Sequence, residues 1–227
     1  SQNNWGWLDS SKIRNEIEIS VGDIRDLDSV SKAINGCSSV YHLAALIGIP
    51  YSYITPLAYI KTNIEGTYNV LEASKLNDVE KLIITSTSET YGSAQHIPMD
   101  EKHELVGQSP YSASKIAADQ LSLSYNKSFG LPIKIVRPFN TFGPRQSARA
   151  IIPSIISQLI KSNTVQVGNI YPKRDFTYVR DTVSGFYEIA SSDKLFGEVT
   201  NIGMNFSISI KDLISIIANI IGVDPEI

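Results

Sequence analysis

The chain has 227 residues, a formal net charge of −3 at pH 7 and 42% hydrophobic residues. This composition is typical of a globular protein with a sizeable core, and the charge excludes a strongly basic surface for nucleic acid or an anionic membrane. A single cysteine, Cys37, excludes an internal disulfide, and no apolar run approaches the roughly 20 residues of a membrane span. Because the first twelve residues also lack the pattern of a signal peptide, we expect a cytoplasmic protein.

The spacing of apolar residues alternates between strand and helix periods over the first 140 residues or so. Strands are predicted at 15–23, 38–46, 81–87 and 132–139, and helices at 27–36, 56–77 and 109–130. This alternation predicts parallel strands joined by helical crossovers, in a doubly wound, Rossmann-like α/β fold with a mostly parallel sheet. Ligands of such sheets bind outside the carboxyl ends of the strands.

Smaller mixed elements follow. A helix is predicted at 150–160, a strand at 164–169, a strand that runs into a helix within 174–192, a strand at 198–203 and a helix at 209–222. This change of pattern predicts a small α/β lobe that covers the carboxyl edge of the sheet.

Two groups of residues indicate chemistry at that edge. Tyr111 and Lys115 are four residues apart on a predicted helix, so their side chains share one face, and we expect the ammonium to lower the tyrosine pKa and make it a usable base. Glu89 follows a predicted strand together with Thr87 and Ser88. This glutamate is either part of a solvated loop or a second catalytic base.

Six motifs in order resemble the extended short-chain dehydrogenase/reductase family that acts on nucleotide sugars. They are GDIRD (22–26), HLAAL (42–46), TNIEGTYNVLEA (62–73), SPYSASK (109–115), RPFNTFGPRQ (137–146) and RDFTYVRD (174–181). The resemblance implies an NAD-binding Rossmann domain over 1–145 with 174–203, and a partial substrate-binding lobe over 146–173 with 204–227. It also implies a homodimer, for which the helices at 56–77 and 109–130 are the candidate surfaces.

Residue by residue, the resemblance assigns three sets and no metal site. The implied catalytic residues are Thr87, Ser88, Glu89, Tyr111 and Lys115. The implied NAD-binding residues are Asp23, Ile24, Leu43, Ala44, Ala45, Asn63, Ser86, Tyr111, Lys115 and Pro138. The implied substrate-binding residues are Thr87, Asn140, Arg149 and Arg174.

One feature of a dinucleotide-binding fold is missing from the sequence, namely the Gly-rich turn between a first strand and its helix. We therefore expect a chain that lacks its first βαβ unit and is truncated at both ends. An alternative is that the chain by itself is inert, because the turn supplies the main anion site for the pyrophosphate.

The resemblance also implies a reaction. Tyr111 would take the proton of the sugar C4 hydroxyl while NAD oxidises C4, Thr87 would hydrogen-bond the same oxygen, and Glu89 would take the C5 proton. Ser88 departs from the Thr-Asp-Glu pattern of many 4,6-dehydratases. The sequence is most similar to bacterial GDP-N-acetylglucosamine 4,6-dehydratases of the legionaminic acid type. UDP-glucuronate decarboxylase, UDP-sugar 4-epimerase and a non-catalytic NAD-binding sensor remain as alternatives.

Overall fold

A parallel β-sheet organises the larger part of the chain in this computed structural model, which describes residues 5–226. Within that range four strands form the sheet in the order β1-β2-β3-β7, and every neighbouring pair is parallel. In the register, Val40 lies opposite Leu82, Leu82 opposite Ile133, and Ile135 opposite Val199. The strands are β1 (Ser39–His42), β2 (Lys81–Thr85), β3 (Ile133–Pro138) and β7 (Val199–Ile202).

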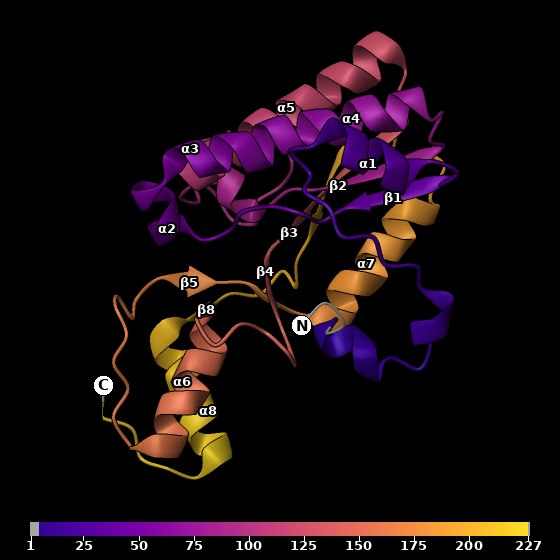
Figure 1. The fold of residues 1–227 in the computed structure, drawn as a ribbon. Helices are drawn as coiled ribbons and strands as arrows, with labels where there is room; N and C mark the ends of the chain where they lie inside the picture. The colour runs from indigo at the N-terminus through magenta and orange to yellow at the C-terminus, as the bar shows by residue number, and fades with distance from the viewer. Residues whose placement is uncertain (1–4, 227) are drawn as a thin grey trace.

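Helices cover both faces of this sheet, as predicted. Figure 1 shows α4 and α5 together above the sheet, with α1 beside α4, and α7 on the opposite side. These helices are α1 (Leu27–Ile34), which precedes β1, and α4 (Gly66–Leu76), α5 (Pro110–Phe129) and α7 (Val179–Ser191), which belong to the crossovers between successive strands. These helices confirm the predictions at 27–36 and 109–130 to within a few residues.

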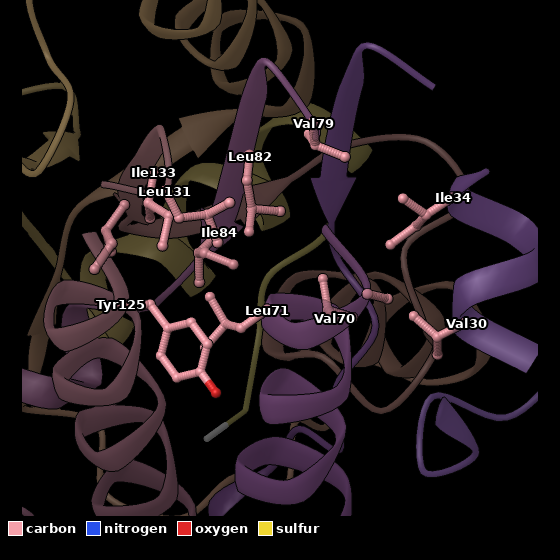
Figure 2. Packing of buried hydrophobic residues seen from close by; sticks show 12 residues of the cluster. Val30, Ile34, Val70, Leu71, Val79, Leu82, Ile84, Tyr125, Leu131 and Ile133 are labelled. Atoms are coloured by element: carbon pink, nitrogen blue, oxygen red, sulfur yellow. The ribbon is translucent and has the colours of Figure 1, made fainter. Parts of the chain in front are cut away.

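The alternation of side chains along β2 assigns one apolar core to each face. Leu82 and Ile84 pack with residues of α1, α4 and α5, whereas Ile83 packs against Ile189 of α7. Figure 2 shows Leu71, Ile84 and other members of the first cluster gathered between the sheet and the helices. Burial of each such aliphatic side chain contributes about 1.5–3 kcal/mol, so β2 is held firmly from both sides.

The predicted helix at 56–77 is present, but it is not uniform. It consists of α3 (Pro56–Tyr59), a π-helical segment (Ile60–Glu65) and α4, and it follows a short helix α2 (Ile49–Ile54) that the sequence pattern did not predict. Widened helical turns of this kind are frequent at functional sites, and this one contains the buried Asn63.

A second, smaller core lies away from the sheet. Helices α6 (Ile151–Lys161) and α8 (Ile210–Ile221) pack through Ile155, Leu159 and Ile214, and they lie together at the lower left of Figure 1. The short antiparallel pair β5 (Lys173–Arg174) and β8 (Ile208–Ser209) adjoins them, and the parallel pair β4 (Asn140–Phe142) and β6 (Phe176–Tyr178) lies between this part and the sheet. The domain boundaries given above stay a prediction, and residues 1–4 and 227 of those domains lie outside the described residues.

Two predicted strands were wrong. Residues 15–23 contain the end of a 3-10 helix (Arg14–Glu16) and then an irregular segment without a partner strand in the part of the chain described, where Val21 is 83% exposed. Residues 164–169 form only an isolated bridge between Thr164 and Glu226. Alternating apolar residues favour an extended backbone, but a strand also needs a neighbour to satisfy its backbone groups.

None of the helices within residues 5–226 is both long enough and apolar enough to cross a membrane.

Candidate active site

The start of α5 places the predicted Tyr111 and Lys115 next to the carboxyl end of β2. Ser109 caps this helix in a reciprocal box: its Oγ accepts from the Ser112 backbone N–H at 3.1 Å, and the Ser112 Oγ accepts from the Ser109 N–H at 2.9 Å. Pro110 occupies the first turn, where its fixed φ suits a helix. The local sequence thus fixes Tyr111 in the first turn and Lys115 one turn later.

Tyr111 is a buried phenol in the first turn of α5, and it is not among the residues that line the cavity described below. It is 8% exposed, and its ring lies edge-on to Tyr59, with 6.1 Å between the ring centroids. Burial raises the pKa of Tyr111 above its ordinary value, and the neighbouring Thr87 side chain acts in the opposite direction. The expectation that Lys115 lowers this pKa was therefore wrong, because the cost of a buried phenolate outweighs the favourable contacts.

Lys115 joins the helix to the end of β2. Its side chain is 4% exposed, and its Nζ donates to the Thr85 carbonyl oxygen at 2.6 Å. Burial lowers the pKa of Lys115, while the charge of Asp119 acts to raise it. The ammonium is thus held by the last residue of the strand that leads to Thr87.

A short 3-10 helix, Ser88–Tyr91, follows β2 and turns the polar run towards a cavity. Thr87 caps this helix: its Oγ1 accepts from the Glu89 N–H at 3.2 Å, and its carbonyl accepts from the Thr90 hydroxyl at 2.8 Å. The strand predicted at 81–87 therefore ends two residues earlier, at Thr85. This early end places Ser88 and Glu89 side by side in the cavity wall.

The cavity has a volume of about 560 Å³, which suits a ligand of substantial size. Four predicted residues line it, namely Ser88, Glu89, Asn140 and Arg174. Asn140 is tied to the residue between β5 and β6, since its backbone N–H donates to the Asp175 carbonyl at 3.1 Å and its Nδ2 donates to the same oxygen at 3.3 Å.

Sequence reasoning missed part of this wall. Lys173, Asn201 and Phe206 also line the cavity, and Phe206 is 69% exposed. Lys173 is adjacent to Arg174, so the sequence could have indicated both basic residues as part of the cavity wall. Asn201 and Phe206 follow Glu89 by more than a hundred residues and reach the cavity through the pairing of β7 with β3, which the sequence pattern did not reveal.

The predicted NAD residues of the first two loops lie at the same edge or next to it. Asp23 is exposed and forms an ion pair with Arg25 at 2.5 Å, and this guanidinium lowers the pKa of Asp23 to about 2. The carbonyl of Ile24 accepts from Asn69 Nδ2 of α4 at 2.9 Å. In the loop after β1, Leu43 is 64% exposed. Ala44 is exposed and Ala45 half-buried in the same loop.

Asn63 and Ser86 use their side chains inside the protein. Asn63 is 1% exposed, and its amide exchanges hydrogen bonds with the backbone of Leu46, accepting at 2.8 Å and donating at 3.0 Å. It also donates to Ser114 Oγ at 2.9 Å. The Ser86 hydroxyl donates to Asp119 Oδ2 at 2.6 Å. Both side chains position neighbouring loops and are not presented at the surface of the site.

The remaining predicted residues lie further apart. Pro138 ends β3 opposite Ile202. Arg149 is exposed and outside the cavity lining, and its backbone N–H donates to Ser147 Oγ at 3.4 Å. The structure therefore brings Arg174, but not Arg149, to the cavity.

A buried ion pair lies behind the site and had no sequence prediction. Asp119 of α5 is 0% exposed, Arg137 of β3 is 2% exposed, and the Arg137 Nη2 donates to Asp119 Oδ2 at 2.8 Å. The sequence did place Asp119 four residues after Lys115, a spacing that puts both side chains on one face of a helix and could have indicated this buried carboxylate.

Comparison with known proteins adds a family. The model of a family described as GDP-mannose 4,6 dehydratase matches residues 1–224. A dTDP-glucose 4,6-dehydratase of Streptomyces griseus is 33% identical over 204 residues, which make up 89% of this chain and 62% of that protein. A UDP-glucuronate 4-epimerase of Thermodesulfobacterium geofontis (strain OPF15) is 37% identical over 188 residues, 82% of this chain and 57% of that protein.

Solved structures share the fold. The dTDP-glucose 4,6-dehydratase DesIV from Streptomyces venezuelae, with NAD and TYD bound, superposes with a TM-score of 0.85 at 27% identity, over 89% of this chain and 63% of that one. This likeness confirms the predicted Rossmann-like α/β fold with a mostly parallel sheet. The chain spans less than two thirds of the length of these relatives.

Proposed function

Because this chain belongs to the GDP-mannose 4,6-dehydratase family, we propose that the protein is an NAD-dependent nucleotide-sugar 4,6-dehydratase. The observation that carries the proposal is the position of Glu89. It lines the cavity beside Ser88, on the turn that Thr87 caps, and both the Glu89 charge and the Thr87 side chain act on the pKa of Tyr111. A carboxylate next to the phenol is what the loss of water across C5 and C6 requires.

The residues at the carboxyl edge of the sheet fit NAD. Leu43 and Ile47 are large apolar side chains, 64% and 72% exposed, on the loop after β1, and they offer apolar surface to a planar ring. Asp23 has an exposed carboxylate that suits a ribose or adenine donor. In this proposal Tyr111 and Lys115 hold the nicotinamide end. When bound, NAD would supply the hydride acceptor for C4 of the sugar and, once reduced, the hydride donor for C6.

The protein's own side chains move the protons. Tyr111 takes the proton of the C4 hydroxyl, and the Thr87 hydroxyl stabilises the phenolate against its burial. Once C4 is a ketone, the C5 proton is acidic, and Glu89 takes it. The C6 hydroxyl then leaves as water with the C5 proton that Glu89 gives back, while the Ser88 hydroxyl orients that group. When hydride returns to C6, C5 takes up a proton, and the proton that Tyr111 removed from the C4 hydroxyl balances it. The dehydration thus consumes no net oxidant.

The cavity also suits the nucleotide diphosphate. Lys173 and Arg174 bring two cationic side chains to its wall, and a guanidinium fork matches phosphate oxygens. Phe206 offers an exposed ring for a base or sugar face. Within this class we propose GDP-N-acetylglucosamine as the substrate, on the resemblance of the run RPFNTFGPRQSARAIIP at 137–153 to such dehydratases.

A 4-epimerase is the second candidate, because a UDP-glucuronate 4-epimerase is among the relatives at 37% identity. Mass spectrometry separates the two after incubation of the natural full-length protein with GDP-N-acetylglucosamine, GDP-mannose, UDP-N-acetylglucosamine and UDP-glucuronate. Loss of one water supports a dehydratase. Unchanged mass with altered stereochemistry supports an epimerase, and loss of CO₂ supports a decarboxylase.

Variants test the roles of the individual residues. Tyr111→Phe is expected to abolish both C4 oxidation and water loss. Glu89→Gln is expected to abolish water loss while oxidation at C4 continues, which would be seen as bound NADH. The matched control is Glu188→Gln on the exposed side of α7, which is expected to leave turnover unchanged. Normal water loss in Glu89→Gln would contradict the role given to this carboxylate.

We also propose a cytoplasmic homodimer that pairs through α3, the π-helical segment and α5. Apolar side chains project from the first two of these: Leu57 is 60% exposed and Ile60 is 50% exposed. Light scattering of the natural protein and of Leu57→Glu would test it, since a monomer in both samples would contradict the pairing.

A further inference from the structure

Asp119 is a buried carboxylate that the proposed reaction does not use. It is 0% exposed and lies on α5 one turn after Lys115 and two turns after Tyr111. Burial of a carboxylate is costly unless cations and hydrogen-bond donors compensate it. Burial raises the pKa of Asp119, and the charge of Arg137 acts against this rise. A buried charge at this place therefore needs a reason.

The partners of Asp119 come from the two strands that carry the site. Its Oδ2 accepts from Arg137 Nη2 at 2.8 Å and from Arg137 Nε at 3.1 Å, both from β3. The same oxygen accepts from the Ser86 hydroxyl at 2.6 Å. Ser86 is the first residue after β2, and its backbone N–H donates to the Val136 carbonyl at 2.7 Å. One carboxylate oxygen thus connects α5, β3 and the end of β2.

Ser86 lies between two residues that contact the predicted catalytic pair. The Thr85 carbonyl accepts from Lys115 Nζ at 2.6 Å, and the Thr87 side chain is a neighbour of Tyr111 that acts on its pKa. A shift of Ser86 relative to α5 would lengthen both contacts together. Such small displacements matter, because about 1 Å of misplacement can cost roughly a hundredfold in rate.

The arginine extends the connection to the cavity wall. Arg137 lies over the ring of Tyr91 at 4.9 Å, and the Tyr91 hydroxyl donates to Asn201 Oδ1 at 2.8 Å. Asn201 lines the cavity, and its Nδ2 donates to the Met99 carbonyl at 3.3 Å. The 3-10 helix that carries Glu89 is therefore anchored at Tyr91 to the same buried group.

We propose that Asp119 is a positioning residue for the catalytic constellation, which clamps the end of β2 to α5 through Ser86 and so fixes Thr87 and Lys115 relative to Tyr111. This inference rests on the proposed function for its kinetic consequence. Asp119 also acts on Lys115 through its charge, which supports the ammonium against burial. A purely structural ion pair would need only Arg137, whereas the 2.6 Å bond to Ser86 ties the pair to the site.

The variants must separate positioning from folding. Asp119→Asn alone leaves Arg137 buried without its counter-ion and is expected to unfold the protein, so paired changes are used. Asp119→Leu with Arg137→Met replaces the pair by apolar packing and removes the acceptor for Ser86. Asp119→Asn with Arg137→Gln removes both charges but keeps an amide oxygen that can accept from Ser86. Ser122→Ala is the control, because this buried hydroxyl donates only within α5, to Ala118 at 2.8 Å.

The kinetic test uses the natural full-length protein with the nucleotide sugar that it turns over. The Leu/Met pair is expected to lower kcat at least about tenfold with KM unchanged to within about threefold, since positioning acts on the chemical step. The Asn/Gln pair is expected to recover most of this loss, and Ser86→Ala to reproduce part of it. A folded Leu/Met variant with unchanged kcat, or an Asn/Gln pair as slow as the Leu/Met pair, would overturn the proposal.

A second readout does not depend on activity. Hydrogen exchange of the peptide that covers residues 82–92 is expected to be at least about tenfold faster in the Leu/Met pair, and unchanged in Ser122→Ala and in peptides of α4. If the natural protein turned over none of the sugars, the proposed function would be wrong. The exchange rates would still show whether Asp119 holds the end of β2 against α5. Unchanged exchange over residues 82–92 would overturn it.

Discussion

Asn63 is the residue whose replacement should most clearly separate a positioning role from simple burial. Asn63→Ala removes three hydrogen bonds, two with the Leu46 backbone and one with Ser114. Each contributes about 1 kcal/mol net, so we expect a loss of about 3 kcal/mol in the free energy of unfolding. For a chain of this size that loss corresponds to a Tm lower by roughly 6–12 °C.

The assay is urea unfolding followed by circular dichroism, with calorimetric titration of NAD in the natural full-length protein. Asn77→Ala is the matched control, because Asn77 donates to Ala73 at 2.7 Å and more weakly to Ser31 at 3.4 Å, away from the loop after β1. The control should lose about 1 kcal/mol and keep its NAD affinity. Equal losses in both variants, or unchanged NAD affinity in Asn63→Ala, would refute the idea that Asn63 holds the loop at Leu46.

Three further predictions concern stability. Burial lowers the pKa of His42 from 6.5 to about 4, so the unfolded chain binds more protons than the folded protein between these pH values. The free energy of unfolding should therefore fall by about 3 kcal/mol as the pH drops from 6.5 to 4. In urea unfolding across this range, His42→Gln should show a weaker dependence of this free energy on pH. Gly66→Ala gains about 1 kcal/mol of helix propensity, but it places a Cβ 2.6 Å from Ile24 Cδ1. We expect thermal unfolding to show a net loss of stability of about 1–2 kcal/mol. A stabilised variant would contradict the close packing at this position. Lys134 is 1% exposed, and its Nζ donates to the carbonyls of Ile189, Ala190 and Ser192 at the end of α7. Lys134→Met should therefore lower the free energy of unfolding by about 2–4 kcal/mol. A loss below about 1 kcal/mol in chemical denaturation would show that water replaces these bonds.

Local patterns were sufficient for the elements of the sheet and for the start of α5. The run SPYSASK contains its own capping box and a proline for the first turn, so the positions of Tyr111 and Lys115 follow from sequence alone. The segment at 15–23 shows where such reasoning fails. It has the right alternation for a strand, yet it has no partner within residues 5–226, and alternation cannot report whether a neighbour exists.

The candidate site was predicted unevenly for the same reason. The sequence identified Glu89 as a carboxylate at the end of a strand, and in the structure Glu89 lines the cavity. The pKa of Tyr111 came out in the opposite direction, because burial by residues from elsewhere in the chain determines it. Ser86 was predicted beside the cofactor, but its hydroxyl is bonded to Asp119, which no local pattern could show.

The sequence by itself therefore determined the strands of the main sheet, most of the helices and the chemical groups at their ends, since these depend largely on neighbours within a few positions. Only the tertiary structure decided which of those groups meet. Asp119 and Arg137 are 18 residues apart, and Tyr91 and Asn201 are 110 apart, yet each pair is in hydrogen-bond contact. Contacts at such separations arise from the order of the strands and from packing across the sheet, and these are properties of the whole chain.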